Sequence, residues 1–177
     1  GIGIYVLEEE EGTGAEVKEG GYIMADYVVR DLNGKITNYT DKQTAKQLGA
    51  YDTTAYYGPK VLTTIKNTIQ AGLADALVGM KEGGRKKIII PSWLMTYKSY
   101  DTPEEYIENA SSGVDAIYDI TVRTFVDSIY NYEIDCIGKH FAEHRDVFGN
   151  MTAADSTDAY GFYYTQPAEP PDTASSP

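Results

Sequence analysis

The segment IQAGLADALVGMKEGGRKKIIIP, residues 69–91, indicates the fold more clearly than any other part of the chain. Its first half carries apolar residues at the spacing of an amphipathic helix, namely Ala71, Leu73, Ala76, Leu77 and Met80. Gly79, Gly83 and Gly84 then interrupt this period. The β-branched run Ile88–Ile90 is typical of a strand, which Pro91 ends because it cannot donate to a ladder. The segment therefore predicts a short helix, a tight reversal and a buried strand.

Alternating apolar residues predict further strands on both sides of this segment. They are expected over residues 4–9, 22–31, 35–39, 61–65 and 114–126, and Asn33-Gly34 is a strong hairpin signal. The inward-facing residues are expected to be Ile23, Ala25, Tyr27, Val29, Tyr118, Ile120 and Val122. A capping box at Thr102–Glu105 predicts a helix from Pro103 to Asn109, whereas the polar residues 41–59 are expected to form a long loop. The predicted fold class is α+β, with a twisted antiparallel sheet of about five strands wrapped around the short helix.

The period of the pattern changes after residue 126. Apolar residues at helical spacing predict one helix over residues 127–149, which would dock on the sheet or act as a spacer. Residues 150–177 are rich in Asp, Thr, Ser, Ala and Pro and are expected to form a poorly ordered tail. Within them, Gly161-Phe162-Tyr163-Tyr164 resembles Gly3-Ile4-Tyr5-Val6, either by chance or as the start of a second copy. The predicted organisation is thus a domain over residues 2–126, a helix and a tail.

The composition of the chain excludes several classes of function. The 177 residues carry a net charge of −12, and the chain lacks the basic stripe that would neutralise nucleic-acid phosphates. No stretch approaches the length of apolar sequence that spans a membrane. Cys136 is the only cysteine, which excludes an internal disulfide. These features favour a globular domain that binds neither nucleic acid nor the membrane interior.

The segment of residues 69–91 resembles the signature of FKBP-type peptidyl-prolyl cis-trans isomerases. The matching residues, in order and at fixed spacing, are Gly72, Leu73, Ala76, Leu77, Gly79, Met80, Gly83, Arg85, Ile90 and Pro91. An ordinary helix-turn-strand unit is the alternative interpretation. The resemblance covers about residues 2–126 and implies isomerisation of X-Pro bonds in unfolded or proline-containing polypeptides, without cofactor or metal. A chain with an FKBP-like domain, long loops and a possible tandem copy resembles bacterial periplasmic or cell-envelope proteins. In such a protein a lipid anchor would lie upstream of this chain, which carries no targeting segment.

Prolyl isomerisation needs no nucleophile, because its barrier of roughly 18–20 kcal/mol comes from amide resonance. An apolar slot that binds the twisted imide, with donors for the substrate backbone, is sufficient. By resemblance the slot residues are Tyr27, Leu73, Tyr97 and Tyr118. The substrate-binding residues are Ile36, Thr37, Asn38, Ile69, Gln70 and Trp93. Backbone donation is expected near Ile69-Gln70, and Trp93 would either cap the slot or cover the core.

The chain departs from the family pattern at two places. Thr37 stands where members have a pocket phenylalanine and Asn38 where they have aspartate, although Ile36 or Tyr39 would substitute if the register slipped. Met95-Thr96-Tyr97 replaces an A-Y-G run, so Tyr97 is expected to supply the hydroxyl donor. These changes leave a second hypothesis open, in which the same slot holds peptides without useful turnover.

A third hypothesis comes from the predicted C-terminal helix. His140-Phe141-Ala142-Glu143-His144 fits the H-x-x-E-H motif of inverted zinc peptidases. The two histidines would lie one helical turn apart, which suits zinc. A further protein ligand would have to come from the short remaining sequence. Solvated helix histidines are therefore the favoured interpretation, and no metal site is predicted.

Overall fold

The structure is a computed structural model that describes residues 3–98, 100–109 and 113–150. The chain divides into two compact units, Gly1–Asp127 and Ser128–Pro177. The first unit contains a six-stranded sheet, in which every strand pair is antiparallel. The strands are β1 (Tyr5–Glu10), β2 (Tyr22–Arg30), β3 (Ile36–Tyr39), β4 (Lys60–Thr63), β5 (Arg85–Ile90) and β6 (Ala116–Val126). Their order is β1-β5-β6-β2-β3, and β4 pairs with β2 beside this path.

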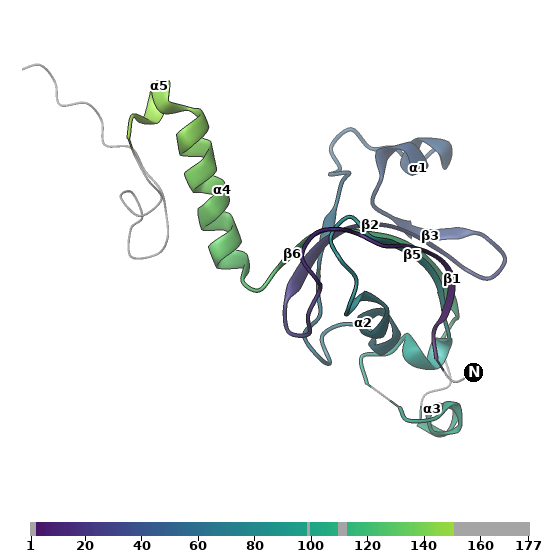
Figure 1. The fold of residues 1–177 in the computed structure, drawn as a ribbon. Helices are drawn as coiled ribbons and strands as arrows, with labels where there is room; N and C mark the ends of the chain where they lie inside the picture. Colours follow the sequence, from purple (N-terminus) through teal and green to yellow (C-terminus); the bar gives the residue numbers. More distant parts are fainter. Residues whose placement is uncertain (1–2, 99, 110–112, 151–177) are drawn as a thin grey trace, which may run out of the picture. The chain divides into compact units, whose positions relative to one another are not determined.

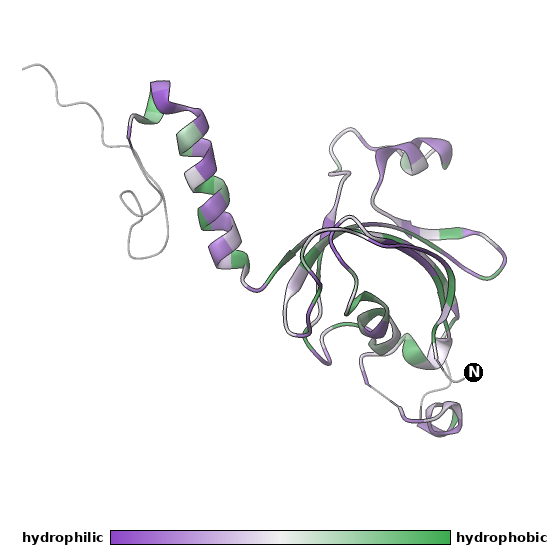
Figure 2. Cartoon of the chain, in the orientation of Figure 1, coloured by the Kyte–Doolittle hydropathy of each residue, from purple (hydrophilic) through white to green (hydrophobic). Residues whose placement is uncertain are grey.

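The sheet curves around one short helix. The described helices of this unit are α1 (Lys42–Gln47), α2 (Ala71–Leu77), the 3₁₀ turn η1 (Ser92–Leu94) and α3 (Pro103–Asn109). Helix α2 lies inside the curve of the sheet, whereas α1 lies beyond its outer face (Figure 1). Helix α1 is mainly hydrophilic, in contrast to the strands that face α2 (Figure 2). The predicted α+β fold, with an antiparallel sheet wrapped around the short helix, is confirmed.

The two central strands build the core through strict alternation. Along β2 every second residue is buried, and the same holds for the first half of β6. All the inward-facing residues predicted from the sequence are buried, and Tyr27 pairs with Ile120 across the two strands. The core therefore lies between the concave face of the sheet and α2.

Helix α2 approaches the sheet closely because one of its residues has no side chain. A Cβ atom on Gly72 would lie 2.5 Å from Ile90 Cγ2 and 2.8 Å from Leu94 Cβ. Leu73 and Leu77 are buried against the sheet from the same helix. At its end Gly79 adopts φ +85°, a conformation that glycine tolerates at no steric cost, and its amide donates to the Val17 carbonyl at 2.9 Å. The predicted reversal between helix and strand is thus observed.

One expectation for the first unit was wrong. The sheet of the described chain has six strands, close to the expected number, and the strand predicted over residues 61–65 is β4, which pairs with β2. Residues 41–59 are not only a loop, since they contain α1. This helix forms because Asp41 caps it, accepting a hydrogen bond from the Thr44 amide at 2.7 Å. The helix predicted over Pro103–Asn109 has those bounds as α3.

The described part of the second unit, residues 128–150, contains two helices in place of the single one predicted. These are α4 (Ile129–Glu143) and α5 (Arg145–Phe148), separated at His144, whose φ of −115° and ψ of 48° are not helical. No helix among the described residues combines the length and apolarity needed to cross a membrane. The expected tail and the Gly161–Tyr164 similarity lie outside the described residues.

Candidate prolyl-peptide slot

A hollow of about 290 Å³ opens beside the start of α2. The residues that line it come from β2, β3, β4, β6, the turn before α2, α2 itself and the loop after η1. They are Tyr27, Asn38, Val61, Leu62, Thr63, Thr68, Ile69, Gln70, Leu73, Tyr97 and Tyr118. We call this hollow the slot. Tyr27, Leu73 and Tyr118 are only 9%, 3% and 9% exposed, so they form its floor while also belonging to the core.

Two tyrosine rings make the apolar floor of the slot. Tyr27 and Tyr118 lie diagonally on β2 and β6, with ring centroids 6.4 Å apart and planes inclined by 48°. Burial raises the pKa of Tyr27, against an opposing side-chain hydrogen bond with Asn38. Burial also raises the pKa of Tyr118, and the nearby Tyr27 and Tyr97 hydroxyls raise it further. Both floor hydroxyls therefore stay protonated and uncharged at neutral pH, where they can donate hydrogen bonds.

The turn before α2 presents two backbone donors. The Thr68 amide donates to Ile65 and the Ala71 amide to Thr96, at 3.1 and 3.0 Å, so the turn is held on both sides. Between them, the amides of Ile69 and Gln70 donate to no acceptor among the described residues. Both residues line the slot. This arrangement leaves two amide donors at the slot for a ligand carbonyl.

The structure brings most of the predicted site residues together. Tyr27, Asn38, Ile69, Gln70, Leu73, Tyr97 and Tyr118 all line the slot. Three predicted residues do not: Ile36, Thr37 and Trp93. The roles of the seven residues that line the slot remain predictions.

A β-bulge explains why the β3 residues divide in this way. Val29 pairs with Asn38 and Arg30 with Ile36, so Thr37 is an extra residue without a cross-strand partner. The Thr37 hydroxyl donates instead to the Val29 carbonyl at 3.4 Å. The register does slip, but it brings neither Ile36 nor Tyr39 into the slot. As a result, the β3 wall offers the Asn38 amide group and no aromatic ring.

Trp93 lies elsewhere. It is buried in η1 as part of the hydrophobic core and lines a second hollow rather than the slot. Among its two predicted roles, the structure therefore places it in a core-covering position. It does not cap the slot.

Sequence reasoning missed four residues that line the slot: Val61, Leu62, Thr63 and Thr68. Three of them lie on β4, whose pairing with β2 could not be read from its short pattern. Val61 is a large apolar residue that remains exposed on β4, a property that the structure shows and the sequence does not.

Arg85, at the start of β5, has acidic partners on both neighbouring strands. The Arg85 guanidinium contacts both carboxylate oxygens of Asp119 at 2.8 Å and also bridges to Glu8 and Glu10. These hydrogen bonds, above all the one with Asp119, raise the pKa of Arg85. Asp119 follows Tyr118 in β6, so this bidentate contact ties β5 to β6 beside the slot.

The histidine pair of α4 is arranged differently from the predicted zinc motif. Its ring centroids lie 4.2 Å apart, but His144 caps the helix end and its Nδ1 contacts the His140 carbonyl at 2.9 Å. Within the described part of the chain, no group of three or more His, Cys, Asp or Glu residues could hold a metal ion. No zinc chemistry is assigned to this pair.

Comparison with known proteins assigns the family. The model of FKBP-type peptidyl-prolyl cis-trans isomerases matches residues 14–123, which is more than half of the chain. The chain therefore belongs to the FKBP-type peptidyl-prolyl cis-trans isomerase family. It is 33% identical over 89 residues to the chloroplastic peptidyl-prolyl cis-trans isomerase FKBP16-1 of Arabidopsis thaliana, a match that covers 50% of this chain and 39% of that protein.

Two solved structures are also similar. One is a peptidyl-prolyl cis-trans isomerase from Pseudomonas syringae, with a TM-score of 0.43 and 17% identity over 69% of this chain and 73% of that one. The other is FkpA from Escherichia coli, with a TM-score of 0.44 and 16% identity over 69% of this chain and 46% of that one.

Proposed function

We propose that this chain is a peptidyl-prolyl cis-trans isomerase that assists the folding of client polypeptides with exposed X-Pro segments. The observation that carries the proposal is the slot itself. Three buried side chains from separate elements form its apolar floor, and two amides that have no acceptor among the described residues lie at its edge. Family membership supports the same chemistry.

The slot suits an imide in mid-rotation. Rotation about the C–N bond removes amide resonance, so the twisted carbonyl loses part of its dipole and needs less solvation than the planar form. A floor of Tyr27, Leu73 and Tyr118 favours that less polar state over the planar one. Because only interactions stronger in the transition state accelerate the reaction, this difference lowers the barrier. No proton transfer or covalent bond to the protein is required.

The polar groups of the slot orient the substrate. The Ile69 and Gln70 amides would donate to carbonyls of the client backbone and hold its chain while the proline turns. The Tyr97 side chain is 58% exposed at the slot and offers a hydroxyl to the same backbone. Each of these donors positions the substrate, whereas the floor of the slot discriminates between the planar and the twisted imide.

A proline-tetrapeptide isomerisation assay on the full chain tests the proposal. Tyr97→Ala should lower kcat/KM by about tenfold, equivalent to about 1.4 kcal/mol of transition-state binding. Tyr130→Ala is a matched control, because Tyr130 is 60% exposed and lies on α4 outside the slot. Its kcat/KM should equal that of the unmodified chain. Unchanged activity in Tyr97→Ala would remove this residue from the mechanism, and an inactive unmodified chain would refute the isomerase.

The second candidate is a peptide-binding module without turnover. It is favoured by the β3 wall, where the Thr37 bulge leaves the slot without an aromatic ring. In that case proline peptides should bind to the slot, and Leu73→Ala should weaken binding, while the isomerisation rate stays at the uncatalysed value. Binding and turnover measured on one peptide distinguish the two functions.

Cellular location and domain organisation are part of the proposal. We place the protein in the bacterial periplasm or cell envelope, with this domain as the first of a tandem pair. This rests on the resemblance to divergent family members with long insertions between strands, here residues 41–59 and 92–113. Fractionation of the source cells with an antibody against this domain tests the location. Recovery in the cytoplasmic fraction alone would refute it.

A further inference from the structure

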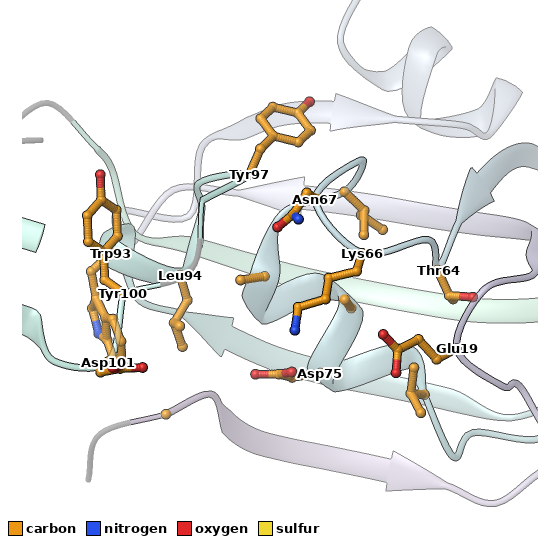
Figure 3. A pocket seen from close by; sticks show the side chains of 15 residues that line it. Glu19, Thr64, Lys66, Asn67, Asp75, Trp93, Leu94, Tyr97, Tyr100 and Asp101 are labelled. Atoms are coloured by element: carbon orange, nitrogen blue, oxygen red, sulfur yellow. The ribbon is translucent and has the colours of Figure 1, made fainter.

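A second and larger hollow, of about 500 Å³, lies next to the slot. Ile69 and Tyr97 line both hollows, so the turn before α2 and the loop after η1 separate them. Figure 3 shows Trp93 and Tyr100 on one side of the second hollow, Glu19 on another, and Lys66 and Asp75 between them. We call it the flanking hollow.

The flanking hollow combines apolar walls with an excess of negative charge. Glu19, Asp75 and Asp101 line it together with the cation Lys66, and the Lys98 ammonium lies 5.0 Å from the centroid of the Tyr100 ring. Trp93, Leu94 and Tyr100 supply the apolar part, and all three are buried. Such a mixture fits a side chain with an apolar stem and a cationic end, because Lys and Arg bury their methylenes and leave the charge near water.

The carboxylates of the flanking hollow also differ from the other acidic group of this unit. On β1 and the turn after it, Glu8, Glu9, Glu10 and Glu11 each pair with a basic residue of the 81–87 segment. Among the ion pairs of the described residues, none includes Glu19, Asp75 or Asp101. The β1 charges are therefore balanced within the sheet, whereas those of the hollow are available to a partner.

We propose that the flanking hollow is a subsite for a Lys or Arg side chain of the client, a few residues from the proline held in the slot. This inference rests on the proposed function, since it assigns the slot a preference for X-Pro segments with basic neighbours. Ile69 and Tyr97 are the shared wall across which the client backbone passes from one hollow to the other.

Peptide binding to the full chain tests the subsite independently of turnover. Three fluorescent peptides share one X-Pro core and carry Lys, Gln or Glu at the flanking positions, and anisotropy gives their Kd values. The Lys peptide should bind about fivefold more tightly than the Glu peptide at low salt, the effect that two exposed ion pairs supply. The ratio should approach one at about 1 M salt, where the Debye length is about 3 Å.

Charge variants identify the residues responsible. Glu19→Gln with Asp75→Asn should remove the preference for the Lys peptide, whereas Lys66→Gln should increase it because the competing cation is gone. The control, Glu133→Gln with Asp135→Asn, removes the same charge from α4 and should keep the wild-type ratio. The preference for the Lys peptide should thus change in opposite directions in the Glu19→Gln, Asp75→Asn variant and in Lys66→Gln. A general loss of fold cannot produce both changes.

The outcomes separate this inference from the isomerase proposal. Equal Kd values for the Lys and Glu peptides, or a preference that survives Glu19→Gln with Asp75→Asn, would overturn the subsite while leaving isomerisation intact. A basic preference without turnover would support the subsite on a peptide-binding module and refute the enzyme. Failure to bind any of the three peptides would overturn both.

Discussion

Replacing Leu73 with Ala tests the slot against a matched residue on the same helix. Leu73 and Leu77 lie one turn apart on α2 and both pack in the core, but only Leu73 lines the slot. A buried Leu→Ala change costs about 2–5 kcal/mol, rising with the cavity that remains. Leu77 is 0% exposed and would leave a closed cavity, so Leu77→Ala belongs near the upper end, at about 4 kcal/mol. Leu73 adjoins an open hollow that water can enter, which places Leu73→Ala near about 2–3 kcal/mol.

The loss of isomerase activity should follow the opposite order to the loss of stability, and so be larger in Leu73→Ala than in Leu77→Ala. Urea denaturation first gives the folded fraction of each variant, and proline-peptide isomerisation is then compared at equal folded concentration. Leu73→Ala should lose about tenfold to a hundredfold in kcat/KM, because the floor of the slot recedes from the twisted imide. Leu77→Ala should retain the unmodified value despite its larger loss of stability.

Loss of activity in proportion to stability in both variants would show that Leu73 acts only as a core residue. Full activity in a destabilised Leu73→Ala variant would likewise exclude Leu73 from the slot floor. Leu73→Met provides the rescue, because it keeps the side-chain volume and usually costs less than about 1.5 kcal/mol. Recovered activity in Leu73→Met alongside a defect in Leu73→Ala would assign the effect to contact at the slot floor.

Two further predictions concern stability. Gly72→Ala should lower the free energy of unfolding by about 1–2 kcal/mol, because overpacking against Ile90 outweighs the helix propensity of alanine. Urea denaturation measures this difference, and a gain in stability would contradict the close approach of α2 to the sheet. Burial raises the pKa of Tyr27 and Tyr118 above the ordinary value of 10.0, so the unfolded chain loses these protons first and stability should fall as pH rises past about 10. The double Tyr→Phe variant should show a shallower fall in an alkaline denaturation series, and an unchanged slope would contradict this.

The sequence predicted the core of the fold because its strongest patterns coincide with its most buried elements. The alternation in β2 and β6 agrees with one arrangement of these strands around α2, and so does the helix–glycine–strand segment. Helix α1 was missed because its few residues are polar and its main signal is one cap, Asp41 followed by Thr44. The break at His144 was missed because apolar residues continue through it, with Phe141 and Phe148 in ring contact across the two helices.

The site was harder to predict than the fold because a slot depends on register and on pairing over long sequence distances. The family resemblance placed Tyr27, Leu73 and Tyr118 in the slot, and strand alternation predicted only the sheet face on which Tyr27 and Tyr118 lie. It could not locate the β4 side of the slot, because a four-residue strand carries too little pattern to show that it pairs with β2. Nor could it show that the Thr37 bulge would direct Asn38 alone into the slot.

The bulge also bears on how selective the slot can be. A slot enclosed by rings on every side would hold the proline tightly and exclude neighbouring residues of the client. Here the β3 wall contributes only Asn38, which contacts the Tyr27 hydroxyl, and Val61 remains exposed at the β4 side. If the chain acts on X-Pro segments as proposed, an open slot gains less energy from the proline ring itself, and we expect contacts to flanking residues to supply a larger share of client binding. The flanking hollow, on the other side of the turn at Ile69, is where such contacts are available.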